Sequence, residues 1–248
     1  MDKDFIIKKL TPSPIRTLRR LIRDHHTQES FSELSMVEKF NKIYEENWWG
    51  RYRSDGKLDF DSGHTSYLDY MLDAYIEALS SLVNDYPNIK SVVDLGCGDF
   101  NVGKRISPLF ESYTGVDIVE KLVERNNSIF ASDAISFICK DITKDDLPRA
   151  DMICVRQVLQ HLSNADIANF LSKISGKYNY LVVTETMHRS WRFKPNKDIP
   201  TGPGVRFHKK SGVVLDAPPF SLRHIEKKVL CDPAIGKEYV VTILYKLH

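Results

Sequence analysis

The sequence predicts an α/β fold built on a doubly wound, mostly parallel β-sheet with an N-terminal helical lid. Short apolar runs typical of buried strands alternate with patterns typical of helices, and such alternation places the strands parallel in one sheet. The predicted strands lie near residues 91–95, 113–118, 135–140, 150–155 and 179–185, and the predicted helices near 102–110, 119–129 and 164–175. Two further apolar stretches, 222–231 and 237–247, predict a terminal antiparallel hairpin.

The chain of 248 residues accounts for one such domain with an N-terminal extension. We place the N-terminal segment at residues 1–62 and the α/β domain at residues 63–248. Apolar side chains from Leu68 to Leu82 recur at helical spacing and predict a helix that leads into the first strand. Residues 186–220 are rich in proline and glycine and form an irregular insert, which in a compact domain is usually functional.

The first 26 residues are basic, with seven Lys and Arg against three Asp. Apolar side chains recur between the arginines, so residues 13–24 predict a short amphipathic helix. Such a helix can lie on an anionic membrane, or its apolar side can pack on the main domain while its arginines are solvated. Residues 27–60 mix polar and aromatic side chains and are expected to form a lid.

Composition excludes several classes of protein. The sequence contains no apolar stretch close to the roughly 20 residues needed to span a bilayer, and it contains no signal peptide. We therefore expect a cytoplasmic protein, and residues 1–26 are the candidate contact with the inner face of the membrane. A net charge of +2 gives no indication of a nucleic-acid partner. The cysteines form no C-x-x-C pair and are expected to be reduced, without a metal. They are Cys97, Cys139, Cys154 and Cys231.

The most informative motif is the run VVDLGCGDFNVG at residues 92–103, which reads as a buried strand that ends at glycines and restarts as a helix. Gly96 and Gly98 can adopt positive φ and leave room for a nucleoside against the turn. Asp94 and Asp99 flank the turn, where they would repel a pyrophosphate and attract an ammonium or sulfonium group.

Two other nucleotide-binding interpretations fit less well. Asn101 stands where the dinucleotide-binding pattern has its third glycine, and Arg105 stands where a Walker-type phosphate loop needs Ser or Thr. Residues 113–118 predict a second strand that ends in a carboxylate. Asp117 therefore becomes the candidate acceptor for both hydroxyls of a ribose.

Four motifs in order resemble the motif series of class I S-adenosylmethionine-dependent methyltransferases, which have a Rossmann-like sheet. They are DLGCG at 94–98, GVDI at 115–118, KDI at 140–142 and ADMICVRQVLQHL at 150–162. The resemblance implies that S-adenosylmethionine is the cofactor, that Asp141 and Ile142 flank its adenine, and that the strand ending near Arg156 faces the methyl group. The predicted cofactor contacts are Asp94, Gly96, Cys97, Gly98, Asp99, Phe100, Asp117, Ile118, Asp141, Ile142 and Arg156.

A narrower resemblance concerns the acceptor. The segments 48–50 (WWG), 62–66 (SGHTS), 98–101 (GDFN) and 217–220 (APPF) resemble a bacterial subgroup associated with modification of surface polysaccharides and other sugars. This resemblance implies O-methylation of a sugar hydroxyl in a glycan or its precursor. A small-molecule or natural-product acceptor and a non-catalytic S-adenosylmethionine-binding protein remain as alternatives. Gln157 stands where that subgroup more often has an acidic residue.

Methyl transfer to oxygen requires a base that removes one proton and groups that hold the acceptor. The loops after the parallel strands should share one crevice. The candidate bases there are His161, Glu185 and His188, and a divalent metal held by Glu185, His188 and Asp198 is an alternative. The candidate substrate-binding residues are Trp48, Trp49, His64, Trp191 and His208.

Arg156 ends the fourth predicted strand and has two interpretations. Its guanidinium can hold a carboxylate or phosphate of an acidic acceptor bidentately. Alternatively, it pairs with Asp99 or Asp141 and organises the cofactor loops.

Overall fold

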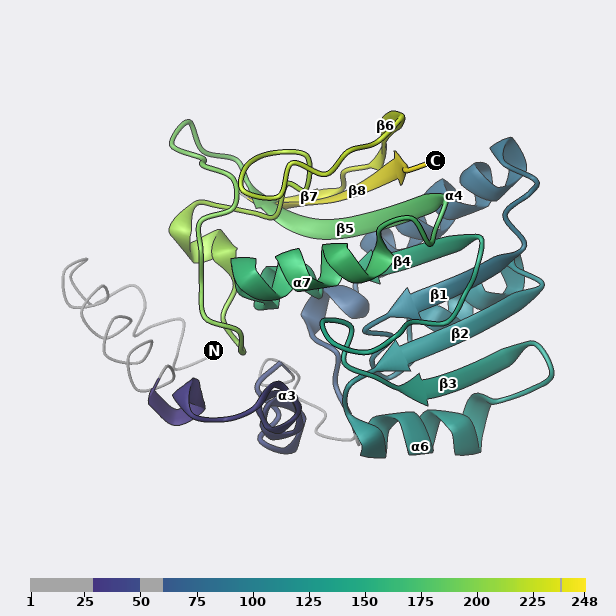
Figure 1. Cartoon of the computed structure of the whole chain (residues 1–248), viewed down its shortest axis with the longest axis horizontal. Coiled ribbons are helices and arrows are strands. Elements are labelled where there is room, and N and C mark those ends of the chain that lie inside the picture. The colour runs from purple at the N-terminus through teal and green to yellow at the C-terminus, as the bar shows by residue number, and fades with distance from the viewer. Residues whose placement is uncertain (1–28, 50–59, 237) are drawn as a thin grey trace, which may run out of the picture.

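The computed structural model describes residues 29–49, 60–236 and 238–248. One β-sheet forms its centre, with strand order β3-β2-β1-β4-β5-β8-β6 and a short strand β7 that pairs with β8 (Figure 1). The strands are β1 (Ser91–Leu95), β2 (Ser112–Asp117), β3 (Ile135–Cys139), β4 (Met152–Arg156), β5 (Tyr180–His188), β6 (Glu226–Cys231), β7 (Ala234–Ile235) and β8 (Glu238–Lys246).

Strands β1 to β5 pair in parallel, which confirms the predicted parallel sheet. The closing pair is antiparallel, also as predicted, and β8 lies between β5 and β6. Strand β5 runs to His188, beyond the predicted end at residue 185, because its last residues pair with the start of β8. The chain order reverses between β1 and β4, and ligands of open α/β sheets bind at such a switch point.

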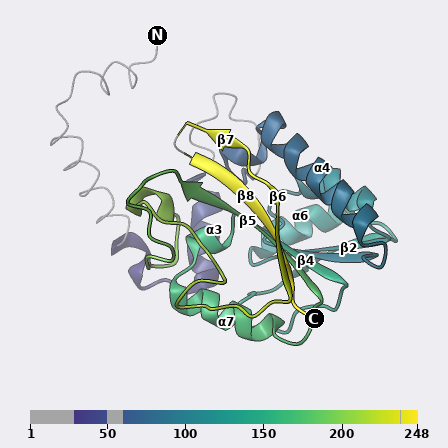
Figure 2. The same cartoon turned by 90° about the horizontal axis from the view of Figure 1, so that it is seen from above.

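Helices cover both faces of the sheet, with α4 and α7 on opposite sides (Figure 2). The predicted helix at 102–110 divides into α5 and η2 because Pro108 has no N–H to continue the α-helical pattern. The α-helices are α3 (Met36–Glu45), α4 (Asp69–Asp85), α5 (Gly103–Ile106), α6 (Glu120–Phe130) and α7 (Asn164–Ile174), and the 3₁₀ helices are η1 (His64–Ser66), η2 (Ser107–Leu109), η3 (Leu159–His161) and η4 (Arg206–Lys209).

Alternation along the strands divides the core into two layers. In β1, Val93 and Leu95 join the cluster that includes Phe170 of α7, whereas Val92 joins the cluster that includes Leu79 of α4. Each central strand is therefore buried on both faces, as expected for a parallel sheet.

The N-terminal segment packs on the α7 side of the sheet. Helix α3 begins at a capping box in which Ser35 and Glu38 satisfy each other's backbone N–H groups, and it buries Phe40 and Ile43 in the core. The predicted basic helix at residues 13–24 lies outside the described residues.

The insert after β5 has little regular structure, and the side chain of Asn196 organises part of it. Its Nδ2 donates to the carbonyl oxygen of Val214 at 2.8 Å, and its Oδ1 accepts from the same residue's N–H at 2.8 Å. In the described ranges, no helix is long and apolar enough to cross a membrane.

Candidate functional site

A cavity of about 1160 Å³ opens at the carboxyl ends of the parallel strands. The strand-end loops form its floor, while the N-terminal segment and the insert form its walls through residues such as Phe31, Trp49 and Val205. Because pockets for one small ligand typically measure about 300–1,000 Å³, this cavity has room for two bound molecules side by side.

The turn after β1 requires its glycines. Gly96 and Gly98 have φ values of +75° and +56°, which non-glycine residues rarely adopt. A Cβ on Gly98 would lie 2.3 Å from the hydroxyl oxygen of Ser62, which itself accepts a hydrogen bond from the Asp99 N–H at 2.9 Å. The turn is thus packed directly against the segment that precedes α4.

Carboxylates line the wall beside this turn. Asp117 accepts hydrogen bonds from the N–H groups of Gly98 (3.0 Å) and Val119 (3.1 Å), and Asp94 accepts one from the Tyr113 hydroxyl (2.5 Å). Burial raises the pKa of both Asp94 and Asp117 to about 6, so both are ionised at neutral pH. Together with the buried Asp99, they make this wall electronegative and suited to a cationic ligand.

Asp141, after β3, has one oxygen engaged and one available. Its Oδ1 accepts from the N–H and hydroxyl of Thr143, at 2.9 and 2.6 Å. Its Oδ2 is buried without a hydrogen bond from the described residues, although the Lys144 ammonium lies 3.4 Å away. With the apolar side chains of Ile118 and Ile142 also lining the cavity, this corner can receive a flat base that carries an amino group.

Arg156 lines the cavity but forms no ion pair with Asp99 or Asp141. Its guanidinium lies over the ring of Tyr75 at 5.4 Å and donates to the Thr65 carbonyl oxygen at 3.3 Å. Its Nε is buried and has no partner among the described residues, so a donor remains for a ligand.

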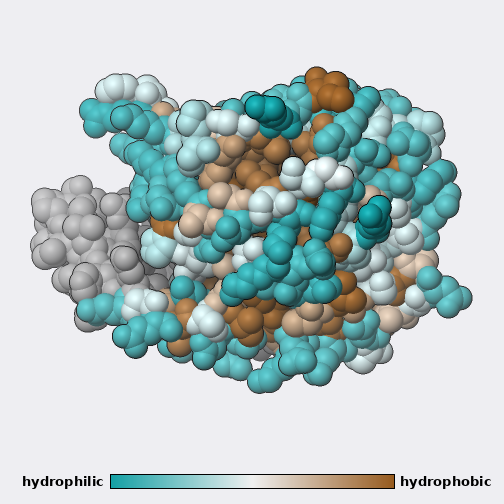
Figure 3. Space-filling view, in the orientation of Figure 1, coloured by the Kyte–Doolittle hydropathy of each residue, from teal (hydrophilic) through white to brown (hydrophobic). Residues whose placement is uncertain are grey.

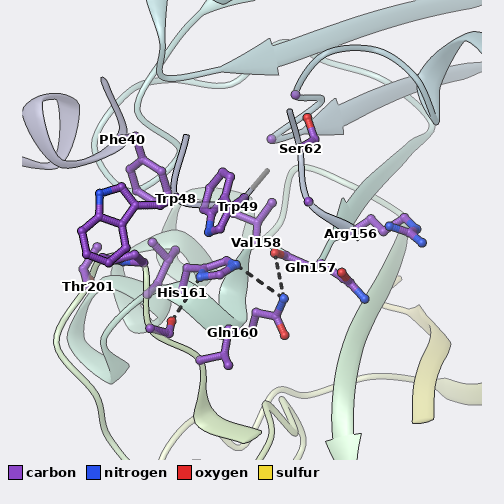
Figure 4. Close-up of a pocket in the computed structure, with 18 of the residues that line it drawn as sticks. Phe40, Trp48, Trp49, Ser62, Arg156, Gln157, Val158, Gln160, His161 and Thr201 are labelled. Carbon is purple, nitrogen blue, oxygen red and sulfur yellow. Dashed lines mark hydrogen bonds between the residues drawn. The ribbon is translucent and has the colours of Figure 1, made fainter. Parts of the chain in front are cut away.

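His161 is the titratable side chain with the clearest geometry for proton transfer. Its Nδ1 lies 3.1 Å from the carbonyl oxygen of Gly204, which can only accept, so Nδ1 carries the hydrogen. Burial lowers the pKa of His161 to about 4, and the ring is therefore neutral with a lone pair on Nε2. The Trp49 ring lies 4.9 Å away, and the Gln160 amide nitrogen is 3.5 Å from Nε2 (Figure 4).

Glu185 does not have the position that its predicted role as a base requires. Its side chain is buried outside the cavity lining, and its oxygens accept from the N–H groups of Leu159 (2.9 Å) and Gln160 (3.1 Å). Arg206, also fully buried, donates to the Leu159 carbonyl oxygen at 2.9 Å. A carboxylate from β5 and a guanidinium from the insert therefore hold η3, which carries His161.

Replacing Arg206 with alanine should destabilise the fold by about 3–5 kcal/mol, because three buried or partly buried acceptors and the Glu185 carboxylate lose their cationic partner. A thermal melt should show a Tm lower by about 10 °C. Arg223→Ala, at an exposed arginine, is the control. Equal melting temperatures for the two variants would contradict this account of η3.

Three further predicted site residues lie outside the cavity lining. Phe100 is buried beneath the glycine turn against Tyr113 and Phe137, so its side chain does not face the cavity in which the cofactor contact was predicted. His188 packs on Phe207 instead, and Trp191 is 87% exposed on the loop after β5.

Most of the other predicted site residues line the cavity. Trp48, Trp49 and His208 line the cavity, as do the remaining predicted cofactor contacts. His64 begins η1, and its side chain lies outside what the structure describes. Among the described residues no group of His, Cys, Asp and Glu could hold a metal ion. This contradicts the alternative of a divalent metal held by Glu185, His188 and Asp198.

Sequence reasoning assigned no site role to Gln157 or Gln160, the amides beside His161. Gln157 has a positive φ of +57°, an uncommon conformation for a non-glycine residue. Its Oε1 accepts from the Thr65 hydroxyl, and its Nε2 donates to the Thr186 hydroxyl at 3.3 Å. No local sequence pattern predicts this backbone conformation, because it depends on contacts of the loop with Thr65 on one side and Thr186 on the other.

Comparison with known proteins agrees with this geometry. Residues 92–177, from β1 to just past α7, match the model of a family described as a methyltransferase domain. No curated protein sequence matches the chain.

Solved structures share the fold at low sequence identity. Magnesium protoporphyrin IX methyltransferase from Synechocystis PCC 6803, crystallised with S-adenosylmethionine, is 14% identical over 86% of this chain and 98% of that chain, with a TM-score of 0.51. The N-methyltransferase NodS from Bradyrhizobium japonicum WM9 is 13% identical over 74% of this chain and 99% of that chain, with a TM-score of 0.51. The N-terminal domain of EvdMO1, with S-adenosylhomocysteine bound, is 12% identical over 87% and 100%, with a TM-score of 0.52.

The acidic wall, the glycine turn and the open oxygen of Asp141 fit a cationic adenosyl compound. The ordered motifs, the strand order and the family match point to the same class of enzyme. Residues 92–177 thus carry a methyltransferase domain on a Rossmann-like sheet, and S-adenosylmethionine is the methyl donor of the enzyme.

Proposed function

We propose that this enzyme transfers a methyl group to a hydroxyl of a sugar, within a glycan or its precursor, with His161 as the general base. The observation that carries the proposal is the hydrogen bond from His161 Nδ1 to the Gly204 carbonyl oxygen. It fixes the tautomer in which Nε2 accepts a proton, and His161 lines the cavity where the acceptor must lie.

One part of the cavity suits the donor. The Asp117 carboxylate can accept from ribose hydroxyls, and Asp141 Oδ2 can accept from the adenine amino group. The negative wall formed with Asp94 and Asp99 attracts the ammonium and sulfonium groups. When bound, S-adenosylmethionine supplies the electrophilic methyl group.

The other part suits a sugar. The Trp49 ring offers an apolar face, and its buried Nε1 has no partner among the described residues, so it can donate to a sugar oxygen. Gln157 and Gln160 add amide groups on the same side as His161 (Figure 4). The aromatic wall and the insert exclude water, while His161 Nε2 takes the hydroxyl proton as the oxygen attacks.

The direct test is transfer of a labelled methyl group to a panel of mono- and oligosaccharides, with the product identified by mass. A saccharide product that is heavier by one methyl group, with that group on a former hydroxyl oxygen, supports the proposal. Methylation of amines alone would refute it.

A small-molecule phenol or natural product is a second candidate acceptor. Phe31, Met36 and Phe40 give one wall of the cavity an apolar surface that fits a flat, apolar molecule. The same labelling assay with phenolic acceptors distinguishes the two, because a sugar O-methyltransferase should leave simple phenols unmodified.

Binding of the donor should weaken as the pH falls through about 6. Asp94 and Asp117 have pKa values raised to about 6, so below this pH they become neutral and no longer attract the cation. Calorimetry should show a dissociation constant at least about 10-fold higher at pH 5 than at pH 7.5. The same raised pKa values mean that the free energy of unfolding of the donor-free protein increases as the pH falls through about 6, because the folded state then binds more protons than the unfolded state. A dissociation constant that does not change with pH would contradict the assignment of Asp94 and Asp117 to donor binding.

A further inference from the structure

The insert at residues 186–220 concentrates positive charge. It contains seven Lys and Arg against two Asp, whereas the whole chain has a net charge of only +2. The rest of the chain is therefore net negative. Arg206 is buried, but the other six cations of the insert reach the surface, and an asymmetry of this kind marks a surface that attracts anions.

Five exposed residues of the insert form what we call the insert patch: Arg189, Trp191, Arg192, Lys194 and Lys210. The Arg192 guanidinium lies 4.5 Å above the Trp191 ring, and the Lys194 N–H donates to the Lys210 carbonyl oxygen at 3.2 Å, which brings the two loops together. None of the ion pairs between described residues involves a cation of this patch. The loop after β5 projects at the upper left of Figure 1, and the same region of Figure 3 is largely hydrophilic.

The insert patch continues from the wall of the cavity. Phe207, His208 and Lys209 line the cavity, and Lys210 follows them directly. The Phe207 ring also packs on His188, 4.7 Å away, at the end of β5 from which the projecting loop starts. A part of an acceptor that extends out of the cavity past Lys209 can therefore reach the insert patch.

We propose that the acceptor is an anionic glycan, whose carboxylate or phosphate groups outside the methylated ring bind the insert patch. The inference rests on the proposed function. Arginine binds carboxylate and phosphate groups bidentately, and the exposed Trp191 ring can stack on the C–H face of a sugar.

Two features favour a glycan over other anionic partners. Trp191 is the only exposed large hydrophobic residue in the insert, which is too little apolar surface for stable insertion into a membrane. The net negative charge of the rest of the chain disfavours a nucleic acid, which carries a far denser charge than an acidic glycan.

The test is direct binding by the full chain, without methyl transfer. Oligogalacturonate serves as the acidic probe, and a malto-oligosaccharide of equal length is the neutral control. The acidic probe should bind at least about 10-fold more tightly than the neutral control, and its binding should weaken with added salt. The triple variant Arg189→Ala, Arg192→Ala, Lys194→Ala should lose about 10-fold in affinity. The matched control is Arg149→Ala, Arg223→Ala, Lys104→Ala, which removes the same charges elsewhere and should bind as the parent does.

Equal affinity for the two probes, or an unchanged affinity in the insert variant, would overturn the inference. Preferential binding to anionic vesicles or to a single-stranded oligonucleotide would overturn it as well. Methylation of neutral glycans without acidic preference would leave the proposed function standing and remove only the inference. Binding of oligogalacturonate without methylation of any glycan would refute the proposed function, and the acceptor assignment with it.

Discussion

Replacing Asp117 with alanine should raise the dissociation constant for S-adenosylmethionine by about 100-fold or more. The variant removes a buried carboxylate from the electronegative wall, and with it the proposed acceptor for ribose hydroxyls. Hydrogen bonds to a charged group contribute about 1.5–3 kcal/mol each, and two such bonds correspond to a loss of this size. Isothermal titration calorimetry measures it directly.

Asp117 also holds the turn through the N–H groups of Gly98 and Val119, so a second variant is needed. Asp117→Asn has the same shape but no charge, and it should fold normally while binding the donor weakly. Asp133→Ala, at an exposed aspartate before β3, is the matched control and should bind normally. Tight binding by a folded Asp117→Asn protein would show that the charge is unimportant.

Replacing His161 with alanine should lower kcat by about 100- to 10,000-fold while leaving the affinity for the donor nearly unchanged. The reduction is the typical contribution of a positioned general base, and the residues that we propose to hold the donor are other ones. The methyl-transfer assay gives kcat, and calorimetry gives the donor affinity. Because the pKa of His161 is lowered to about 4, kcat should show no loss near pH 6.5 from this residue.

His188→Ala is the matched control for this experiment. His188 is a second histidine near the same end of the sheet but lies outside the cavity lining, so its replacement should leave kcat within about twofold. Similar losses in the two variants would point to a general disturbance of the loops rather than to proton transfer. Full activity of His161→Ala would leave the enzyme without its proposed base.

Much of the fold could be predicted because its signals are local. Short apolar runs that alternate with helical patterns locate β1 to β5, and the glycines at 96 and 98 mark the turn after β1. The position of β8 between β5 and β6 could not be predicted in this way, since the pairing partner of a strand depends on contacts distant in sequence.

More of the predicted donor contacts than of the predicted acceptor residues line the cavity, for a related reason. Asp117 and Asp141 follow strands whose carboxyl ends must meet at one edge of the sheet. Glu185 also lies near such an end, but it is buried beneath η3 by contacts with residues 25 and 26 positions away. Sequence spacing shows which residues reach the edge of a sheet, and only packing decides which of them face the cavity.

The antiparallel strand β8 has a consequence for the order of assembly. During synthesis β6 emerges before β8, yet among the described strands β6 pairs with β8 alone. The β5 edge therefore stays open until β8 has left the ribosome, and the nascent chain exposes an unpaired strand edge during that interval. We infer that the last step of folding is the insertion of β8, which closes the edge and completes the wall that includes Glu238.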